Sequence, residues 1–355
     1  MASSFFQDII SKQFNPDAVL NLSVSPDMAG DKVLIISDLH MGSGSRDDFH
    51  SNGDLVRRIL EEYYYKNGWY LILNGDIEEL AKYSLSAIRN EWARMYKVFD
   101  LFASAGRLFK ILGNHDEDLI FESNYPYQLY NVVHIETPQI PVYVYHGHQS
   151  SKVYTKFNNI VRLSLRYIFK PIGIRNISSA RSPNRRFHVE KQAYLFSMEN
   201  NCISIIGHTH RALFESLSRI DYIKFEIEKH CRDYPSSSGT SRERIANEVK
   251  ALRQELGKLN KQERRNSRLA LYGNELPIPC LFNSGCAIGK KGFNAIELDK
   301  DKITLVYWYA EGKGMKFVNR GWYKVEKFFG CYRSVLNQER LDYVKSRIEL
   351  FNGNI

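Results

Sequence analysis

The sequence predicts an α/β protein built as a two-sheet β-sandwich flanked by helices, with helical insertions. Short apolar runs alternate with helix-length amphipathic stretches over residues 32–112, and this β-α-β-α-β order is typical of a parallel sheet. Further strands, near 132–135 and 140–145, follow with no helix between them. They indicate a second, more antiparallel sheet.

The elements can be placed in chain order from the period of the apolar residues. We expect strands at 32–37, 69–73, 107–112, 277–282, 293–298 and 302–309, with helices near 52–66, 85–104, 187–200 and 338–351. Residues 1–31 are expected to be an N-terminal extension, and residues 32–355 one domain that carries two insertions, 150–200 and 222–275.

The first strand carries the clearest chemical signal. Residues 33–42 read VLIISDLHMG, a short apolar run that ends in a carboxylate and an imidazole two residues apart. Side chains two apart on an extended chain point to the same side. Asp38 and His40 can therefore converge on one cation.

Four later apolar runs end in the same way. They lead into Asn74-Gly75-Asp76, Gly113-Asn114-His115-Asp116, His146-Gly147-His148 and Gly207-His208-Thr209-His210. One such histidine or Gly-Asp pair is more often a structural turn. Five in order favour a shared site, where glycine allows the backbone to turn tightly and approach the ions.

The order D-x-H, G-D, G-N-H-[DE], H and G-H-x-H resembles the calcineurin-like metallophosphoesterases, from Asp38 to His210. The resemblance implies two sheets packed between helices and two divalent ions. It implies that Asp76 bridges the ions, that Asp38, His40 and His210 complete one shell, and that Asn114, His146 and His208 complete the other. Mixed nitrogen and oxygen ligands suit Mn²⁺, our first choice, with Fe or Zn²⁺ as alternatives. His148 is a poorer ligand candidate than His146.

The chemistry implied by the resemblance is hydrolysis of a phosphomonoester, phosphodiester or pyrophosphate bond. Two such ions can clamp a phosphoryl group and lower the pKa of a bridging water. His115 follows the ligand Asn114 and is expected to act as the general acid, with Asp116 orienting it through a hydrogen bond.

Within the family, the UDP-2,3-diacylglucosamine pyrophosphatases are the most similar in architecture, since they also place a helical cap after the ligand histidine of the fourth block. Their substrate class suggests a nucleotide-sugar or lipid-linked diphosphate. This chain departs from them in having His115 where they carry Arg, and in its long basic arm.

The first insertion begins with an amphipathic helix, residues 152–170. One side is apolar, and the other carries Lys152, Lys156, Arg162, Arg166 and Lys170. These cations are either solvated or belong to a cap that receives an anionic substrate over the metal cleft.

The second insertion contains a long basic helix. Residues 242–268 hold nine Lys and Arg against four Glu. Such a face is either solvated or a docking surface for a polyanion, a membrane surface or a partner protein. A nuclease that uses this arm is the alternative function, although few aromatic residues lie among its cations to stack on single strands.

The composition fits these expectations. The 355 residues carry a net charge of +9, which favours anionic partners such as the phosphate-ester substrate. Five cysteines with no C-x-x-C pair are typical of a reducing compartment. The N-terminal residues show no signal-peptide pattern and no apolar run is long enough to span a membrane, so we expect a cytoplasmic protein.

Overall fold

The computed structural model describes residues 22–24, 31–44, 47–148, 183–214, 223, 227–228, 230–266, 278–288, 292–312 and 324–351. It divides into two compact units. The first comprises Met1–Phe214 and Cys280–Ile355, and the second Glu215–Pro279. The predicted basic arm, 222–275, falls within the second unit.

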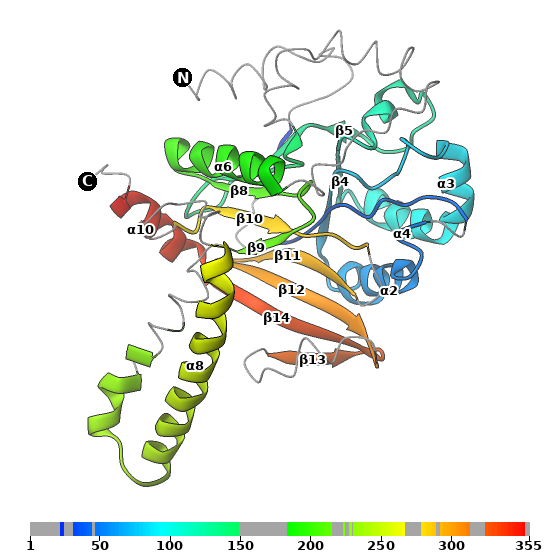
Figure 1. Ribbon diagram of the computed structural model, residues 1–355. Coiled ribbons are helices and arrows are strands. Elements are labelled where there is room, and N and C mark those ends of the chain that lie inside the picture. Colours follow the sequence, from blue (N-terminus) through cyan, green and yellow to red (C-terminus); the bar gives the residue numbers. More distant parts are fainter. Residues whose placement is uncertain are drawn as a thin grey trace. The chain divides into compact units, whose positions relative to one another are not determined.

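The larger sheet of the first unit has eight strands in the order β13-β14-β12-β11-β2-β3-β4-β5 (Figure 1). One half is parallel: β2 (Lys32–Ile36), β3 (Tyr70–Asn74), β4 (Leu108–Ile111) and β5 (Leu129–Tyr130). The other half is antiparallel: β11 (Phe293–Asp299), β12 (Lys302–Ala310), β13 (Val325–Phe328) and β14 (Cys331–Arg340). The helix α10 (Leu341–Phe351) follows β14 directly.

The smaller sheet has six strands, β1 (Leu22–Val24), β6 (Val132–Ile135), β7 (Val142–Tyr145), β8 (Ile203–Ile206), β10 (Leu281–Ser284) and β9 (Ala212–Phe214), in that order. The expectation of a more antiparallel second sheet is wrong, because β7, β8 and β10 run parallel. The connection from β7 to β8 includes the helix α6 (Pro183–Asn200), and such a crossover returns the chain in the same direction. The pairing of β1 with β6 was not predicted.

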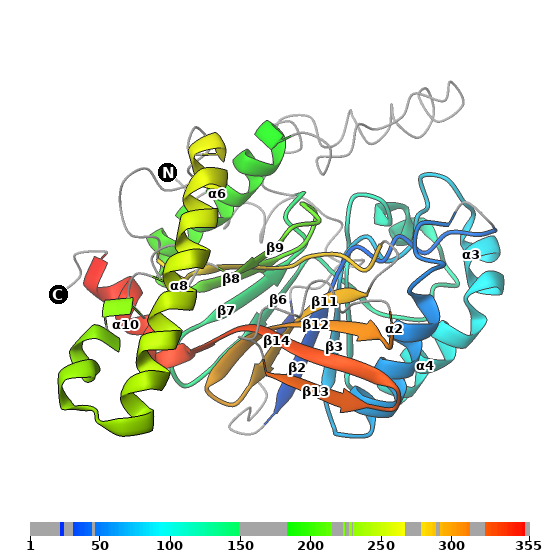
Figure 2. The same cartoon turned by 60° about the horizontal axis from the view of Figure 1, so that its bottom comes forward.

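Helices cover the outer face of the larger sheet (Figure 2). They are α2 (Gly53–Ile59), which continues as the π-helix η1 (Leu60–Tyr65), α3 (Leu85–Glu91) and α4 (Ala93–Ser104). Leu34 and Leu71 pack in one core cluster with Phe99 of α4. The alternate strand residues Val33 and Ile72 are also buried. The strands are therefore apolar on both faces, as their sequences predict.

α6 covers the smaller sheet. Its Val189, Ala193 and Phe196 share a core cluster with Ile206 of β8 and Leu281 of β10. The helix α6 therefore covers the whole predicted helical stretch, 187–200. The predicted helix 152–170 lies outside the described residues.

The two sheets are joined at the ends of β2 and β10, where Ser37 Oγ and Ser284 Oγ lie 2.7 Å apart. Two sheets with helices on their outer faces constitute the predicted fold class, which is confirmed.

The second unit is built on the helix α8 (Gly239–Asn266), preceded by the 3₁₀ turn η6 (Tyr234–Ser236). Ile245 and Leu252 of α8 are buried, whereas Arg242, Lys250 and Arg253 are exposed. None of the helices that the structure describes combines the length and apolar composition needed to span a bilayer.

Candidate metal centre

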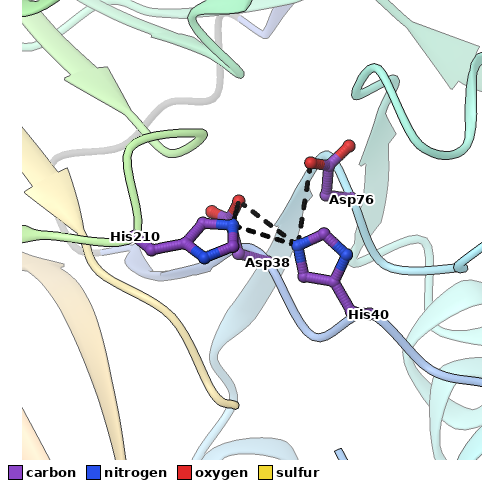
Figure 3. Close-up of side chains that lie close together, drawn as sticks. All are labelled: Asp38, His40, Asp76 and His210. Carbon is purple, nitrogen blue, oxygen red and sulfur yellow. Dashed lines mark hydrogen bonds and ion pairs between the residues drawn. The ribbon is translucent and has the colours of Figure 1, made fainter. Parts of the chain in front are cut away.

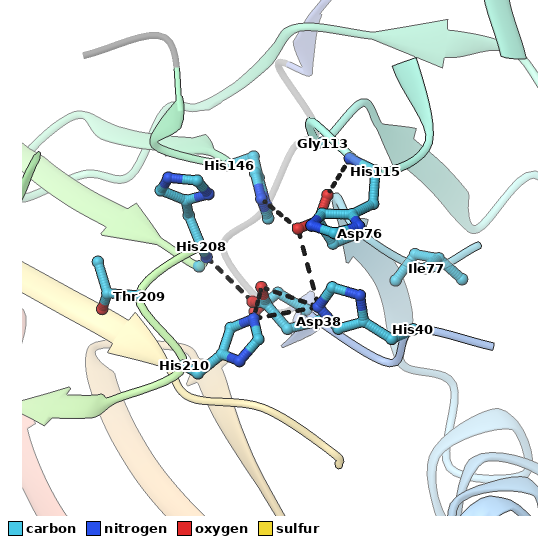
Figure 4. Close-up of polar contacts among 12 residues, drawn as sticks. Asp38, His40, Asp76, Ile77, Gly113, His115, His146, His208, Thr209 and His210 are labelled. Atoms are coloured by element: carbon cyan, nitrogen blue, oxygen red, sulfur yellow. Dashed lines mark hydrogen bonds and ion pairs between the residues drawn. The ribbon is translucent and has the colours of Figure 1, made fainter. Parts of the chain in front are cut away.

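Five loops meet at one edge of the sandwich. β2, β3 and β4 run parallel in one sheet, and β7 and β8 run parallel in the other, so the carboxyl ends of each set share an edge. The loops that follow these strands bring six predicted ligands together (Figure 4): Asp38, His40, Asp76, His146, His208 and His210.

The first group of side chains consists of Asp38, His40, Asp76 and His210 (Figure 3), whose donor atoms all lie within 4.8 Å of one another. His210 Nε2 lies 3.1 Å from Asp38 Oδ1. His40 Nε2 lies 3.8 Å from Asp76 Oδ2 and 3.0 Å from His210 Nε2. Two carboxylate and two imidazole donors therefore surround one position.

The second group consists of Asp76, His146 and His208, all buried and again within 4.8 Å. His146 Nε2 lies 3.2 Å from Asp76 Oδ2. Asp76 therefore belongs to both groups, which is the arrangement that the sequence resemblance implies. His148 is buried beside them, with its ring centroid 5.4 Å from that of His146, but belongs to neither group of described side chains.

Backbone amides fix both carboxylates. Asp38 Oδ2 accepts a hydrogen bond from the amide of His208 at 3.0 Å, and Asp76 Oδ1 accepts one from the amide of His115 at 2.8 Å. The other oxygen of each, Asp38 Oδ1 and Asp76 Oδ2, is left to face the imidazoles. This orientation is typical of carboxylates prepared to bind a cation.

Three buried acceptors of the predicted ligand set lack a hydrogen-bond partner among the described residues: Asp38 Oδ1, Asn114 Oδ1 and His146 Nε2. In the neutral form of His146, the form that binds a metal, Nδ1 carries the proton, because it lies 2.8 Å from the carbonyl of Asn74 and must donate to it. Nε2 then carries the lone pair. Buried acceptors without a donor are costly, and divalent cations would satisfy all three. The residues present therefore fit divalent metal ions.

The backbone of the site is strained. Asp38, His40, Asp76, His208 and His210 have φ values of 54°, 50°, 54°, 63° and 56°, in the left-handed region that residues other than glycine rarely adopt. Each such residue costs about 1–3 kcal/mol and persists only where the surroundings fix it. The strain is concentrated on the predicted ligands.

Two glycines make the close approach of the loops possible. A Cβ atom at Gly75 would collide with the ring of His146, and one at Gly113 would collide with Asp76. Gly75 also has φ +77°. The glycines beside the ligands are therefore required sterically, as the sequence indicated.

Electrostatics hold two of the predicted ligands, Asp76 and His208, in the protonation state that binds metals. Burial opposes ionisation of Asp76, but His146 and His115 outweigh it and hold the pKa of this carboxyl well below its usual range. Burial and the neighbouring His146 lower the pKa of His208 to about 3, so this imidazole is neutral at pH 7. An ionised carboxylate and a neutral imidazole are the forms that bind metals.

His115 lies at the rim of the cluster, with 13% of its side chain exposed. Its Nδ1 lies 2.8 Å from Glu79 Oε1, while Glu79 Oε2 lies 3.0 Å from His40 Nδ1. Burial disfavours protonation of His115, but the charge of Asp76 and the contact with Glu79 outweigh it and raise its pKa to about 9. Sequence reasoning missed Glu79, although a carboxylate three residues after Asp76 in the same loop was a usable signal.

The predicted contact between Asp116 and His115 is wrong, because the Asp116 carboxylate is engaged elsewhere. Its two oxygens accept from the amides of Ile77 at 2.8 Å and Gly113 at 2.6 Å, and Lys110 Nζ lies 2.5 Å away. Lys110 is completely buried and also pairs with Glu78 at 3.2 Å. Asp116 therefore holds together the loops that carry Asp76 and Asn114, and the orienting contact to His115 comes from Glu79.

Comparison with known proteins agrees with this geometry. The family model described as calcineurin-like phosphoesterase matches residues 31–212, just over half of the chain. The chain belongs to this family, and it is a metal-dependent hydrolase that acts on phosphate esters. No curated protein matches the sequence significantly.

Among solved structures, the phosphoesterase YfcE from E. coli is 11% identical, with a TM-score of 0.35, over 87% of this chain and 99% of its own. Vacuolar Protein Sorting 29 from Cryptosporidium parvum is 13% identical, with a TM-score of 0.32, over 80% of this chain and 93% of its own.

Proposed function

We propose that this chain is a binuclear metallophosphoesterase that hydrolyses a phosphomonoester, phosphodiester or pyrophosphate bond. The observation that carries the proposal is the position of Asp76, whose carboxylate belongs to both groups of donor atoms. A shared carboxylate is what two closely spaced divalent ions require. When bound, such ions polarise the phosphoryl oxygens and activate water for attack.

The chain's own residues would complete the reaction. Glu79 holds Nδ1 of His115, so Nε2 is the ring atom that can deliver a proton to the leaving-group oxygen. Asn114 would join His146 and His208 at the second position, since its Oδ1 is a buried acceptor without a hydrogen-bond partner in the described structure. Mn²⁺ is the ion we propose first, with Fe and Zn²⁺ as alternatives.

The substrate class we favour is a nucleotide-sugar or lipid-linked diphosphate, on the basis of the insertion after the fourth strand-end motif. A nuclease is the second candidate, favoured by the exposed Arg242, Lys250 and Arg253 of α8. The diphosphate hydrolase and the nuclease would use the same metal ions, and they would differ in the substrate that the surrounding surface binds.

Turnover of a substrate panel tests the proposal. The panel contains p-nitrophenyl phosphate, bis-p-nitrophenyl phosphate, a UDP-sugar, a cyclic nucleotide and single-stranded DNA, each with Mn²⁺ and after chelation. We expect Mn²⁺-dependent hydrolysis of at least one nitrophenyl ester, lost on chelation and restored by Mn²⁺. Hydrolysis that is unaffected by thorough chelation would refute the proposal.

A further inference from the structure

One buried carboxylate connects α6 to the loop that carries His208 and His210. Glu190 of α6 is 2% exposed. Its Oε1 accepts from Thr209 Oγ1 at 2.9 Å and from Arg211 Nε at 3.2 Å, and its Oε2 accepts from Arg211 Nη2. Thr209 lies between the two histidines and Arg211 follows them, so one side chain binds the loop at two points.

The opposite side of Thr209 is held by β10. Asn283 Nδ2 donates to Thr209 Oγ1 at 3.0 Å and to the carbonyl of Gly207 at 2.8 Å. Because a hydroxyl has one proton, Thr209 donates to Glu190 and accepts from Asn283. The loop is thus fixed from α6 on one side and from the sheet on the other.

This fixation is needed because the loop is strained. His208 and His210 both have positive φ, 63° and 56°, on either side of Thr209. Residues other than glycine keep such a backbone only where several contacts impose it. Without Glu190, the loop would keep the contacts from Asn283, from Asp38 Oδ2 to the His208 amide and from the Gly207 amide to the carbonyl of His146. It would lose its hydrogen bonds to α6 through Thr209 and Arg211.

We propose that Glu190 is a positioning residue that holds the imidazoles of His208 and His210 in the geometry that binds the ions. The inference rests on the proposed function, since it assigns both histidines as ligands. It also makes α6, which lies between β7 and β8 in the chain, part of the metal centre as well as of the core. A contact that orients metal ligands in this way contributes about 10–100-fold to metal affinity or activity.

The test compares Glu190→Ala and Glu190→Gln with a matched control, Glu297→Gln. Glu297 of β11 is also a buried carboxylate bound by an arginine, Arg333, and it contacts Tyr64 at 2.7 Å rather than a ligand loop. Mn²⁺ affinity is measured by isothermal titration calorimetry on metal-free protein, and thermal unfolding is recorded for each variant.

We expect Glu190→Ala to weaken Mn²⁺ binding about 10–100-fold. Glu190→Gln should lose less Mn²⁺ affinity than Glu190→Ala, because the amide oxygen of the glutamine can still accept the hydrogen bond from Thr209. Glu297→Gln should lower the melting temperature and leave Mn²⁺ affinity within about twofold of wild type, since its contacts are structural. If Glu190→Ala does not fold, Thr209→Val, which removes the hydroxyl at similar size, must show the same loss of affinity.

Wild-type Mn²⁺ affinity in folded Glu190→Ala would overturn the inference, as would an equal loss of affinity in Glu297→Gln. A wild-type protein that binds Mn²⁺ but hydrolyses no phosphate ester would refute the proposed function alone, and weaker Mn²⁺ binding by Glu190→Ala would then still support the positioning role. A wild-type protein that binds no divalent metal overturns both.

Discussion

Glu79 contacts His115 and His40 at once, with Oε1 2.8 Å from His115 Nδ1 and Oε2 3.0 Å from His40 Nδ1. One carboxylate therefore orients both the residue that we assign as general acid and a residue that we assign as metal ligand. Replacing it with the isosteric amide, Glu79→Gln, should lower turnover about 10–100-fold, because an amide holds the imidazoles less strongly. Steady-state kinetics with Mn²⁺ in excess measures this loss of turnover. An unchanged kcat would show that Glu79 does not orient the two imidazoles for catalysis.

The proton-donor role of His115 predicts a dependence on the leaving group. His115→Ala should retain the wild-type metal content and lose about 10²–10⁴-fold in kcat, the usual contribution of a positioned acid. The loss should be smaller for a nitrophenolate, which leaves without a proton, than for an alkoxide. Equal losses for good and poor leaving groups would exclude the role.

The buried Lys110 predicts a large effect on stability. Lys110→Met leaves Asp116 and Glu78 buried without their cation, which should lower the free energy of unfolding by about 3–5 kcal/mol. Urea denaturation of the metal-free protein measures the change. Lys82→Met, which removes a half-exposed lysine that pairs with Glu79 at 3.4 Å, is the control and should cost less than about 1 kcal/mol. Similar losses of unfolding free energy in both variants would contradict the stabilising role that we assign to the buried Lys110.

The exposed cations of α8 predict an effect on binding without an effect on chemistry. Reversal of Arg242, Lys250 and Arg253 to Glu should leave turnover of p-nitrophenyl phosphate unchanged and weaken binding to phosphatidylserine vesicles, because each cation near an anionic surface contributes about 1 kcal/mol. Reversal of Arg94 and Lys97, exposed on α4, is the matched control. Vesicle binding that is equal in all variants would exclude an anionic membrane surface as the ligand of these cations.

The sequence predicted the fold and most of the site for one physical reason. Parallel strands of one sheet share an edge, so the polar residues that follow them lie together there, as Asp38 and Asp76 do after β2 and β3. His146 follows β7 of the smaller sheet and joins Asp76 from that side. The pairing of the later strands could not be predicted from the sequence. The strands β11 to β14 extend the larger sheet, but nothing in their sequences specifies which edge they join.

The contacts that hold the ligands in place could not be predicted in the same way. Glu190 reaches Thr209 only through the packing of α6 on the smaller sheet, and no local pattern encodes that distance. Asp116 was assigned to His115 because the two are adjacent in sequence, whereas the fold directs its carboxylate to Lys110 and two amides.

The shared carboxylate is the central claim, and the metal content of Asp76→Asn tests it most directly. Purified wild-type protein saturated with Mn²⁺ and then desalted should carry two ions per chain by elemental analysis and hydrolyse bis-p-nitrophenyl phosphate. Asp76→Asn removes the charge common to both groups of donors, so it should lose at least one ion and all measurable hydrolysis. Two ions per chain with wild-type turnover in this variant would contradict the account.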